Sequence, residues 1–282
     1  MRDGHPNEVR VYKPQSEGSI PLVVLIHGGG FCLGHYTHIS TYSRAVVSLT
    51  GATVVAISYR LAPEFKFPTA PHDVWDTINW LVEPEMAQKL GVNPHAGLYI
   101  GSISAGANLA AVTAQRWVAQ NKSPQMSGVW LQIPWLLEKP IVPERYQYSW
   151  FSREQNAQAL IINEHAMEFV KEAYKPDLLS PDFSPFNATN PHRGMPPVYL
   201  QICGQDPLRD DGLIYERALR DHGVSTRLDV YPGVPHGFAD VYHQLEVSKK
   251  CRVDALRGVG WLFGNEPSDD ECHAALLGVQ AS

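Results

Sequence analysis

Short apolar segments that alternate with helical segments along most of the chain restrict its fold more than any other feature. Residues 53–59 (TVVAISY) are β-branched and apolar without interruption, as expected for a strand that is buried on both faces. Residues 97–101 form a second predicted strand, and the alanine- and leucine-rich residues 105–118 that follow predict a helix. Strands separated by helices predict an α/β fold, with a mostly parallel central sheet and helices on both faces.

The same patterns predict the remaining elements. Further strands are expected at residues 9–12, 22–26, 129–133, 198–203 and 226–231. Further helices are expected at residues 74–81, 209–221 and 240–263, and Gly223 is placed to end the second of these. The last dozen residues, from about Asp270, are expected to form a loosely held tail.

Residues 136–197 interrupt this alternation. They contain no clean strand, several aromatic side chains, a helical stretch near residues 164–174 and a proline-rich run at residues 176–185. An insertion of this size between two strands is more typical of a lid or cap than of a plain connection. We therefore expect one domain over residues 1–282, with a small helical cap at residues 136–197.

A candidate nucleophile, Ser104, stands between a predicted strand and a predicted helix, in the segment SISAGANLA. A serine on such a sharp turn is held with its hydroxyl above the sheet, and the turn needs small residues two positions before and two after it. Ser102 and Gly106 fill those positions. A helix that begins at Ala105 also favours negative charge nearby. A serine-rich turn before an alanine-rich helix is the purely structural alternative.

The segment HGGGF (residues 27–31) directly follows another predicted strand. Consecutive glycines allow backbone N–H groups to converge on one point, as an oxyanion hole requires, and we expect Gly28, Gly29 and Ala105 to supply these groups. The glycine-rich phosphate-binding patterns GxxxxGK[ST] and GxGxxG are absent. His27 is interpreted as a brace for the loop rather than a general base.

An acid and a base follow in the order that a serine hydrolase of this architecture uses. Asp206 comes after the strand at residues 198–203, and His236 comes after the strand at residues 226–231. With Ser104, all three lie after the carboxyl ends of predicted strands. Asp210 and Asp211 compete with Asp206 for the role of the acid, but they fall inside the following helix.

These motifs resemble those of the hormone-sensitive-lipase-like branch of the α/β-hydrolase superfamily. The resemblance rests on HGGGF, YRLAPE followed by FPTAPHD, SISAGANLA, DPLRDDG and HGF, and it covers residues 9–263. The family usually reads GDSAGGNLA at the nucleophile, so Ser102, Ile103 and Ala107 depart from it. Its members usually carry tens of residues before the RVYKP strand, where this sequence has about eight. The resemblance therefore implies an α/β-hydrolase fold with a shortened N-terminal cap.

The resemblance also implies an activity: cleavage of carboxylic esters through an acyl-enzyme, with Ser104, His236 and Asp206 as the catalytic triad. Short-to-medium or bulky apolar esters or lactones, including esters of secondary metabolites, are the expected substrates. Seven apolar residues are candidates for the substrate pocket, and ordinary core positions are the alternative for each: Phe31, Leu33, Trp135, Trp150, Phe151, Leu208 and Phe238.

Two other functions stay open. The same pocket could catalyse transacylation, elimination or cyclisation, and the unusual sequence around Ser104 favours this alternative. The chain could also be a ligand receptor or binding module, as some relatives without the catalytic histidine are. His236 is retained here, which disfavours a receptor.

Composition excludes several other classes. The chain has 23 Lys and Arg against 29 Asp and Glu, a formal net charge of −6, so no nucleic-acid partner is expected. No apolar stretch is long enough for a membrane span or a secretory signal, which predicts a cytoplasmic protein. The 4 cysteines form no CxxC pair and no HExxH is present, so neither a metal nor a cofactor is expected. The expected partner is a small-molecule ester, and a homodimer stays open.

Overall fold

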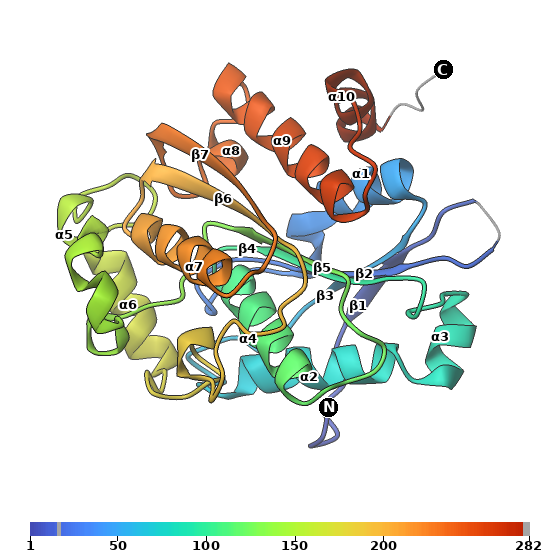
Figure 1. The fold of residues 1–282 in the computed structure, drawn as a ribbon, viewed down its shortest axis with the longest axis horizontal. Helices are drawn as coiled ribbons and strands as arrows, with labels where there is room; N and C mark the ends of the chain where they lie inside the picture. Colours follow the sequence, from blue (N-terminus) through green and yellow to red (C-terminus); the bar gives the residue numbers. More distant parts are fainter. Residues whose placement is uncertain (16–17, 279–282) are drawn as a thin grey trace.

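One seven-stranded sheet runs through the computed structural model, which describes residues 1–15 and 18–278 (Figure 1). Its strands lie in the order β1-β3-β2-β4-β5-β6-β7, and only β1 is antiparallel to its neighbour. The predicted α/β fold with a mostly parallel sheet is confirmed. The strands are β1 (Val9–Tyr12), β2 (Leu22–Ile26), β3 (Thr53–Ile57), β4 (Leu98–Ile103), β5 (Gly128–Gln132), β6 (Val198–Gln205) and β7 (Thr226–Pro235).

Helices cover both faces of this sheet (Figure 1). They are α1 (Ser40–Thr50), α2 (Thr69–Leu81), α3 (Pro84–Leu90), α4 (Ala105–Ala119), α5 (Ser152–Gln155), α6 (Glu164–Tyr174), α7 (Arg209–Asp221), α8 (Phe238–Val241), α9 (Glu246–Leu262) and α10 (Asp269–Leu277). Short 3-10 helices occur at η1 (Tyr36–Ile39), η2 (Lys139–Ile141), η3 (Glu144–Ser149) and η4 (Pro185–Asn187). Among the helices described, none is both long and apolar enough to cross a membrane.

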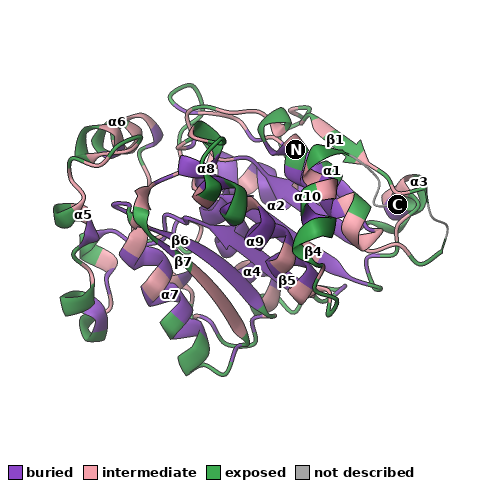
Figure 2. Ribbon diagram, turned by 90° about the horizontal axis from the view of Figure 1, so that it is seen from above, coloured by how far each residue is buried: buried purple, intermediate pink, exposed green. Residues whose placement is uncertain are grey.

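The continuous apolar strands supply two separate cores. Alternate residues of a strand point to opposite faces. Val24 of β2 belongs to the core that includes residues of α2, α4 and α7, whereas Leu25 belongs to the core that includes residues of α1, α9 and α10. Both side chains are at most 1% exposed. Figure 2 shows the central strands and the helix faces that cover them as buried. This double burial explains why the strand at residues 53–59 reads as an unbroken apolar run rather than an alternating one.

Two expectations for the C-terminal part of the chain are wrong. The single helix predicted at residues 240–263 is two helices, α8 and α9, because the backbone leaves the helical conformation at Tyr242 and is extended at Leu245, directly before α9. The predicted loose tail forms the helix α10 instead. Ser268 and Glu271 cap its start reciprocally, and Cys272 is buried between α10 and the helices α1 and α9. Only residues 279–282 of the tail lie outside the described part.

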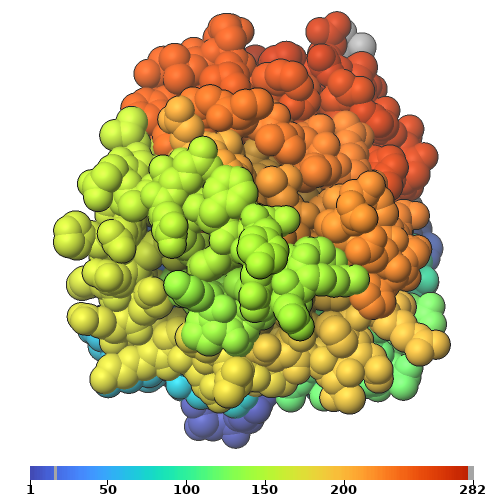
Figure 3. Space-filling model, turned by 60° about the vertical axis from the view of Figure 1, so that its left-hand side comes forward, coloured from blue at the N-terminus to red at the C-terminus, as the bar shows by residue number. Residues whose placement is uncertain are grey.

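The segment between β5 and β6, residues 133–197, contains η2, η3, α5, α6 and η4 and no strand of the described sheet. The predicted helix at residues 164–174 is confirmed as α6. In Figure 3 the yellow-green residues of this segment gather over one face of the molecule, and Figure 2 shows that α5 and α6 carry exposed outer surfaces. The segment lies at the carboxyl-end edge of the parallel strands, where ligands bind in open α/β sheets.

Candidate active site

Ser104 occupies the sharp turn that joins β4 to α4. Its φ of 57° and ψ of −124° are strained for a residue with a side chain. The turn is tight because strand and helix pass closely: a Cβ on Gly106 would lie 2.1 Å from Ser102 Oγ and 2.4 Å from the His27 carbonyl oxygen. The Ser102 hydroxyl is fully buried and donates to the Ile26 carbonyl oxygen. The departure from glycine at position 102 is therefore accommodated by a hydrogen bond to the neighbouring strand.

The structure brings the three predicted catalytic side chains into contact. His236 Nε2 lies 2.8 Å from Ser104 Oγ, and His236 Nδ1 lies 2.8 Å from Asp206 Oδ2. The Leu208 N–H donates to the other carboxylate oxygen of Asp206 at 2.8 Å, which fixes the orientation of that group. Asp206 and His236 are buried, whereas Ser104 is half-buried. This arrangement can move a proton from the serine hydroxyl to the imidazole while the carboxylate holds the ring.

The glycine loop after β2 lies beside Ser104. A Cβ on Gly28 would be 2.9 Å from the Ile103 carbonyl oxygen and 3.3 Å from Ser104 Cβ, so glycine permits this close approach. Gly29 has a φ of +114°. Within the described residues, neither glycine donates its N–H to another protein group. Ala105 is the first residue of α4, where the N–H has no acceptor inside the helix. The three expected oxyanion donors are thus grouped around the serine.

His27 is packed as a structural residue. Its ring stacks on Tyr59 at 4.5 Å between centroids, and Nδ1 lies 2.7 Å from the Gly28 carbonyl oxygen. Burial lowers the pKa of His27 to about 4, so the ring is neutral at neutral pH. A neutral ring that holds the glycine loop matches the interpretation of His27 as a brace.

A cavity of about 970 Å³ opens in front of Ser104 and His236. Its walls are largely apolar. They come from the glycine loop and η1, from the turns after β3, β4, β5 and β7, from α8, and from α6 with the residues before it. The apolar lining residues are Cys32, Leu33, Ile39, Ala62, Pro63, Ile103, Ile133, Ile161, Ile162, Ala166, Phe169 and Val170. Size and apolar character both suit a small organic ligand.

Of the seven predicted pocket residues, only Leu33 lines this cavity. Phe31, Trp135, Leu208 and Phe238 are at most 4% exposed and belong to the hydrophobic cores. Phe31 points away from the cavity because it stacks on Tyr174 at 4.1 Å. The expectation that these four residues contact substrate is therefore corrected: they support the walls of the site from behind.

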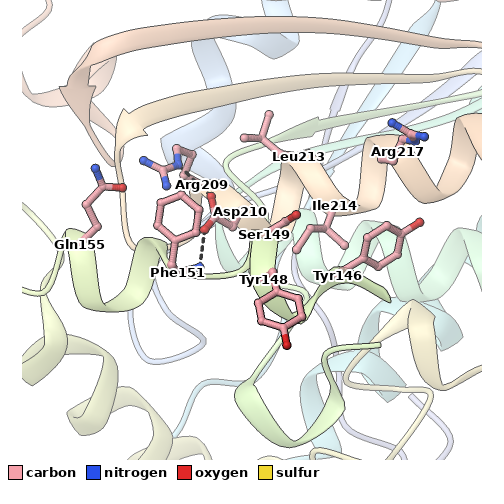
Figure 4. A pocket seen from close by; sticks show the side chains of 10 residues that line it. All are labelled: Tyr146, Tyr148, Ser149, Phe151, Gln155, Arg209, Asp210, Leu213, Ile214 and Arg217. Carbon is pink, nitrogen blue, oxygen red and sulfur yellow. Dashed lines mark hydrogen bonds and ion pairs between the residues drawn. The ribbon is translucent and has the colours of Figure 1, made fainter. Parts of the chain in front are cut away.

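Trp150 and Phe151 also lie outside the cavity that contains Ser104. Phe151 lines a separate hollow with Tyr146, Tyr148 and Arg209, shown in Figure 4, and the Arg209 guanidinium lies 5.1 Å from the centre of its ring. Trp150 lines a further hollow next to α6. Both residues are held away from the nucleophile because their neighbourhood is fastened to the start of α7.

Asp210 and Asp211 make that attachment. Asp210 Oδ2 accepts the N–H groups of Phe151 and Ser152 at 2.7 and 2.6 Å. Asp211 Oδ2 accepts the N–H groups of Leu136 and Leu137, each at 2.9 Å. Asp211 also accepts a hydrogen bond from Trp150 Nε1 at 3.0 Å and pairs with Arg153 at 2.9 Å. Burial raises the pKa of Asp211 to about 6, against the opposing effect of Arg153. These competing acids hold the β5–β6 segment, and Asp206 alone of the three contacts His236.

Sequence reasoning missed the contribution of α6. Ala166, Phe169 and Val170 lie three and four positions apart, the spacing of one helix face. Phe169 is 65% exposed and borders the cavity together with the other two residues. That pattern could have identified α6 as a wall. His38 and Asp240 also line the cavity, and no sequence motif pointed to them.

Comparison with known proteins agrees with this arrangement. The family model described as "alpha/beta hydrolase fold" matches residues 23–240. An AB hydrolase superfamily protein of Schizosaccharomyces pombe is 34% identical over 275 residues, which span 96% of this chain and 80% of the relative. A versiconal hemiacetal acetate esterase of Dothistroma septosporum is 32% identical over 260 residues, which span 90% of this chain and 77% of the relative.

Among solved structures, that of a vibralactone cyclase has a TM-score of 0.87 and 30% sequence identity, covering 94% of this chain and 79% of the cyclase. The fold, the motif order and these similarities agree over nearly the whole chain. The chain therefore belongs to the α/β-hydrolase-fold family, in the hormone-sensitive-lipase-like carboxylesterase branch that its motifs resemble.

Proposed function

We propose that this protein hydrolyses carboxylic esters through an acyl-enzyme on Ser104. The observation that carries the proposal is the pair of 2.8 Å contacts that link Ser104 to His236 and His236 to Asp206 at the wall of an apolar cavity. The esterase among the relatives supports the same chemistry. A complete set of nucleophile, base and acid weighs against a receptor without catalytic activity.

In the proposed mechanism, His236 Nε2 accepts the Ser104 proton as the hydroxyl oxygen attacks the ester carbonyl carbon. The N–H groups of Gly28, Gly29 and Ala105 receive the negative charge that develops on the carbonyl oxygen. His236 then gives the proton to the departing alkoxide, and the alcohol leaves. Water, deprotonated by the same imidazole, attacks the acyl-enzyme and releases the acid. Asp206 orients the ring and stabilises its charged form throughout.

The substrates we propose are medium-sized or bulky apolar esters or lactones. The cavity of about 970 Å³ leaves room for such groups, and its apolar walls favour them over charged ones. We propose further that residues 136–197 act as a cap, because Ala166, Phe169 and Val170 of α6 form one wall of the cavity. A series of nitrophenyl esters of increasing acyl length tests the substrate range, and a clear preference for long chains would contradict it.

Replacement of the nucleophile tests the reaction itself. Ser104→Ala is expected to lower kcat for a nitrophenyl ester by at least about 10³-fold, because the covalent step has no alternative nucleophile. A fluorophosphonate probe should label the wild type and leave Ser104→Ala unlabelled. Ser149→Ala, which removes an exposed serine outside the cavity, is the matched control and should keep both activity and labelling. Wild-type turnover in Ser104→Ala would refute the proposal.

Cyclisation or another non-hydrolytic reaction is the second candidate. The similarity to a vibralactone cyclase and the departures from the usual motif at Ser102 and Ile103 favour it. Product analysis in ¹⁸O-labelled water separates the two reactions. Hydrolysis places one labelled oxygen in the acid product, whereas cyclisation within the substrate yields an isomer of unchanged mass.

A further inference from the structure

A smaller polar pocket of about 240 Å³ lies next to the large cavity. Its walls come from η1, α1, α8 and α9 and from the loop that follows α8. The lining residues are His38, Thr41, Tyr42, Asp240, His243 and Arg252. His38 and Asp240 also line the large cavity, so the two spaces share a wall. A ligand bound at Ser104 would therefore lie next to this polar side pocket.

Two buried polar groups in the side pocket have no partner among the described residues. Tyr42 is only 4% exposed, and its hydroxyl makes no hydrogen bond within the protein. Arg252 Nε is likewise unpaired, although Arg252 Nη2 donates to the Ala239 carbonyl oxygen at 2.6 Å and so fixes the guanidinium. Burial raises the pKa of Tyr42 well above its ordinary value, which keeps the phenol protonated. Buried donors without partners are unfavourable, so a ligand that accepts from them gains affinity.

The charges in the side pocket define what it can accept. Arg252 is a cation and a donor, Asp240 is an acceptor, and the Tyr42 and Thr41 hydroxyls can do both. A carboxylate bound here would face the like charge of Asp240, and an ammonium group would face the like charge of Arg252. A neutral hydroxyl group avoids both penalties, because it accepts from Tyr42 or Arg252 and donates to Asp240.

We propose that the side pocket binds a hydroxyl group of the ester substrate and makes the enzyme selective for hydroxylated esters. The proposal rests on the esterase activity proposed above. It assigns specificity to Tyr42, Asp240 and Arg252, which lie outside the Ser104, His236 and Asp206 contacts.

Two matched pairs of esters test the proposal. Phenyl acetate against 3-hydroxyphenyl acetate places the hydroxyl in the alcohol part, and 4-nitrophenyl butanoate against 4-nitrophenyl 3-hydroxybutanoate places it in the acyl part. For at least one pair, the hydroxylated ester should have a kcat/KM about fivefold higher, the effect of roughly one net hydrogen bond. Tyr42→Phe removes only the phenol oxygen and should bring the ratio of the two kcat/KM values close to one.

Tyr215→Phe is the matched control. Tyr215 is fully buried and its hydroxyl is also unpaired within the described residues, but it lies on α7 and lines neither pocket. This variant should keep the wild-type ratio. Asp240→Ala, at an exposed position of the side pocket, removes the proposed hydroxyl acceptor and gives a second variant whose ratio should fall.

The outcomes separate this proposal from the esterase activity. Equal kcat/KM values within both pairs, together with normal cleavage, would overturn the hydroxyl site and leave the esterase intact. If the ratio of kcat/KM values in Tyr42→Phe equals that of the wild type, the proposed hydroxyl site is overturned as well. A stronger preference for a carboxylate-bearing ester, such as a 4-nitrophenyl hemisuccinate, would show an anion site instead. Failure of the wild type to cleave any ester would refute the proposed function itself.

Discussion

At position 106, a single extra carbon would reach both the neighbouring serine and the neighbouring strand. A Cβ there would lie 2.1 Å from Ser102 Oγ and 2.4 Å from the His27 carbonyl oxygen, and the backbone oxygen cannot rotate away. We therefore expect Gly106→Ala to lower the free energy of unfolding by about 1–3 kcal/mol, the effect of overpacking a core. Because the shift displaces Ser104, kcat should fall by at least about tenfold.

Gly233→Ala provides the comparison. No atom lies within 4 Å of the position that a Cβ on Gly233 would take. Gly233→Ala should therefore change neither the free energy of unfolding nor kcat measurably. Urea unfolding and nitrophenyl ester kinetics on both variants check the prediction. Equal stabilities for the two variants would mean that the turn after β4 can relax, and that close approach does not require glycine at position 106.

The three residues of the candidate triad could be located from the sequence because each has a local signature. Ser104 follows a strand and precedes a helix, and Asp206 and His236 each follow a strand in the order that the fold requires. The cavity wall lacks such signatures. Phe31 and Leu33 both lie in the glycine loop, yet Phe31 has a φ of 60° and turns into the core while Leu33 is 71% exposed. A pattern of apolar letters cannot show which way a loop directs each side chain.

At the scale of elements, sequence patterns located the seven strands and the helices α2, α4, α6 and α7, but they did not predict α1, α3 or α5. Predicted and observed bounds coincide for β1, β2 and α7, where apolar runs or periodic faces are unbroken. The break between α8 and α9 spans residues 242–245, where Tyr242 leaves the helical conformation and Leu245 is extended, and this segment contains neither glycine nor proline. The start of α10 did carry one, because Ser268 and Glu271 form a readable capping box.

The attachment of the β5–β6 segment to α7 is a property of elements that can be tested directly. Asp211→Asn removes the charge that accepts the Leu136 and Leu137 N–H groups and pairs with Arg153. Hydrogen bonds to a charged group contribute about 1.5–3 kcal/mol, so amide hydrogen exchange at residues 136 and 137 should accelerate roughly ten- to hundredfold. Mass spectrometry or NMR at neutral pH measures this exchange.

Asp221→Asn is the control for that experiment. Asp221 terminates the same helix, and its carboxylate pairs with Arg217 and contacts the side chains of Arg145 and Tyr146. Among the described residues it accepts no hydrogen bond from the backbone of residues 136 and 137. Its replacement should leave exchange at residues 136 and 137 unchanged. If Asp211→Asn also leaves exchange there unchanged, the Asp211 carboxylate does not hold residues 136 and 137 in place.

For the whole molecule, the parallel sheet is what assembles the site. Gly28, Ser104, Asp206 and His236 follow β2, β4, β6 and β7, which are distributed over most of the chain length. Their strands run in the same direction, so all four residues lie at one edge of the sheet. The two cores on opposite faces keep that edge rigid. The topology of the sheet therefore made the positions of these four residues predictable. No comparable rule predicts how the β5–β6 segment folds over them.

Buried neutral histidines make the whole fold sensitive to acid. Burial lowers the pKa of His192 from 6.5 to about 3 and that of His27 to about 4. Below pH 6.5 these two histidines bind protons in the unfolded chain but not in the folded chain. The free energy of unfolding therefore has its full contribution from them above pH 6.5 and decreases as the pH is lowered. Each histidine should lower the free energy of unfolding by roughly 1.4 kcal/mol for each unit by which the pH is decreased, between about pH 6 and its pKa in the folded state.

His192→Phe isolates one of these contributions. The His192 ring packs edge-on against Phe186 at 4.7 Å and its Nδ1 is buried without a partner, so phenylalanine should fit while removing the titration. Urea unfolding at pH 6.5, 5.5 and 4.5 measures the free energy of unfolding. For His192→Phe, this free energy should change with pH by about 1.4 kcal/mol per unit less than it does for the wild type. His95→Phe, at an exposed histidine, should keep the wild-type slope. Coincident slopes for all three proteins would mean that His192 takes up its proton equally in the folded and unfolded states, and would contradict the prediction.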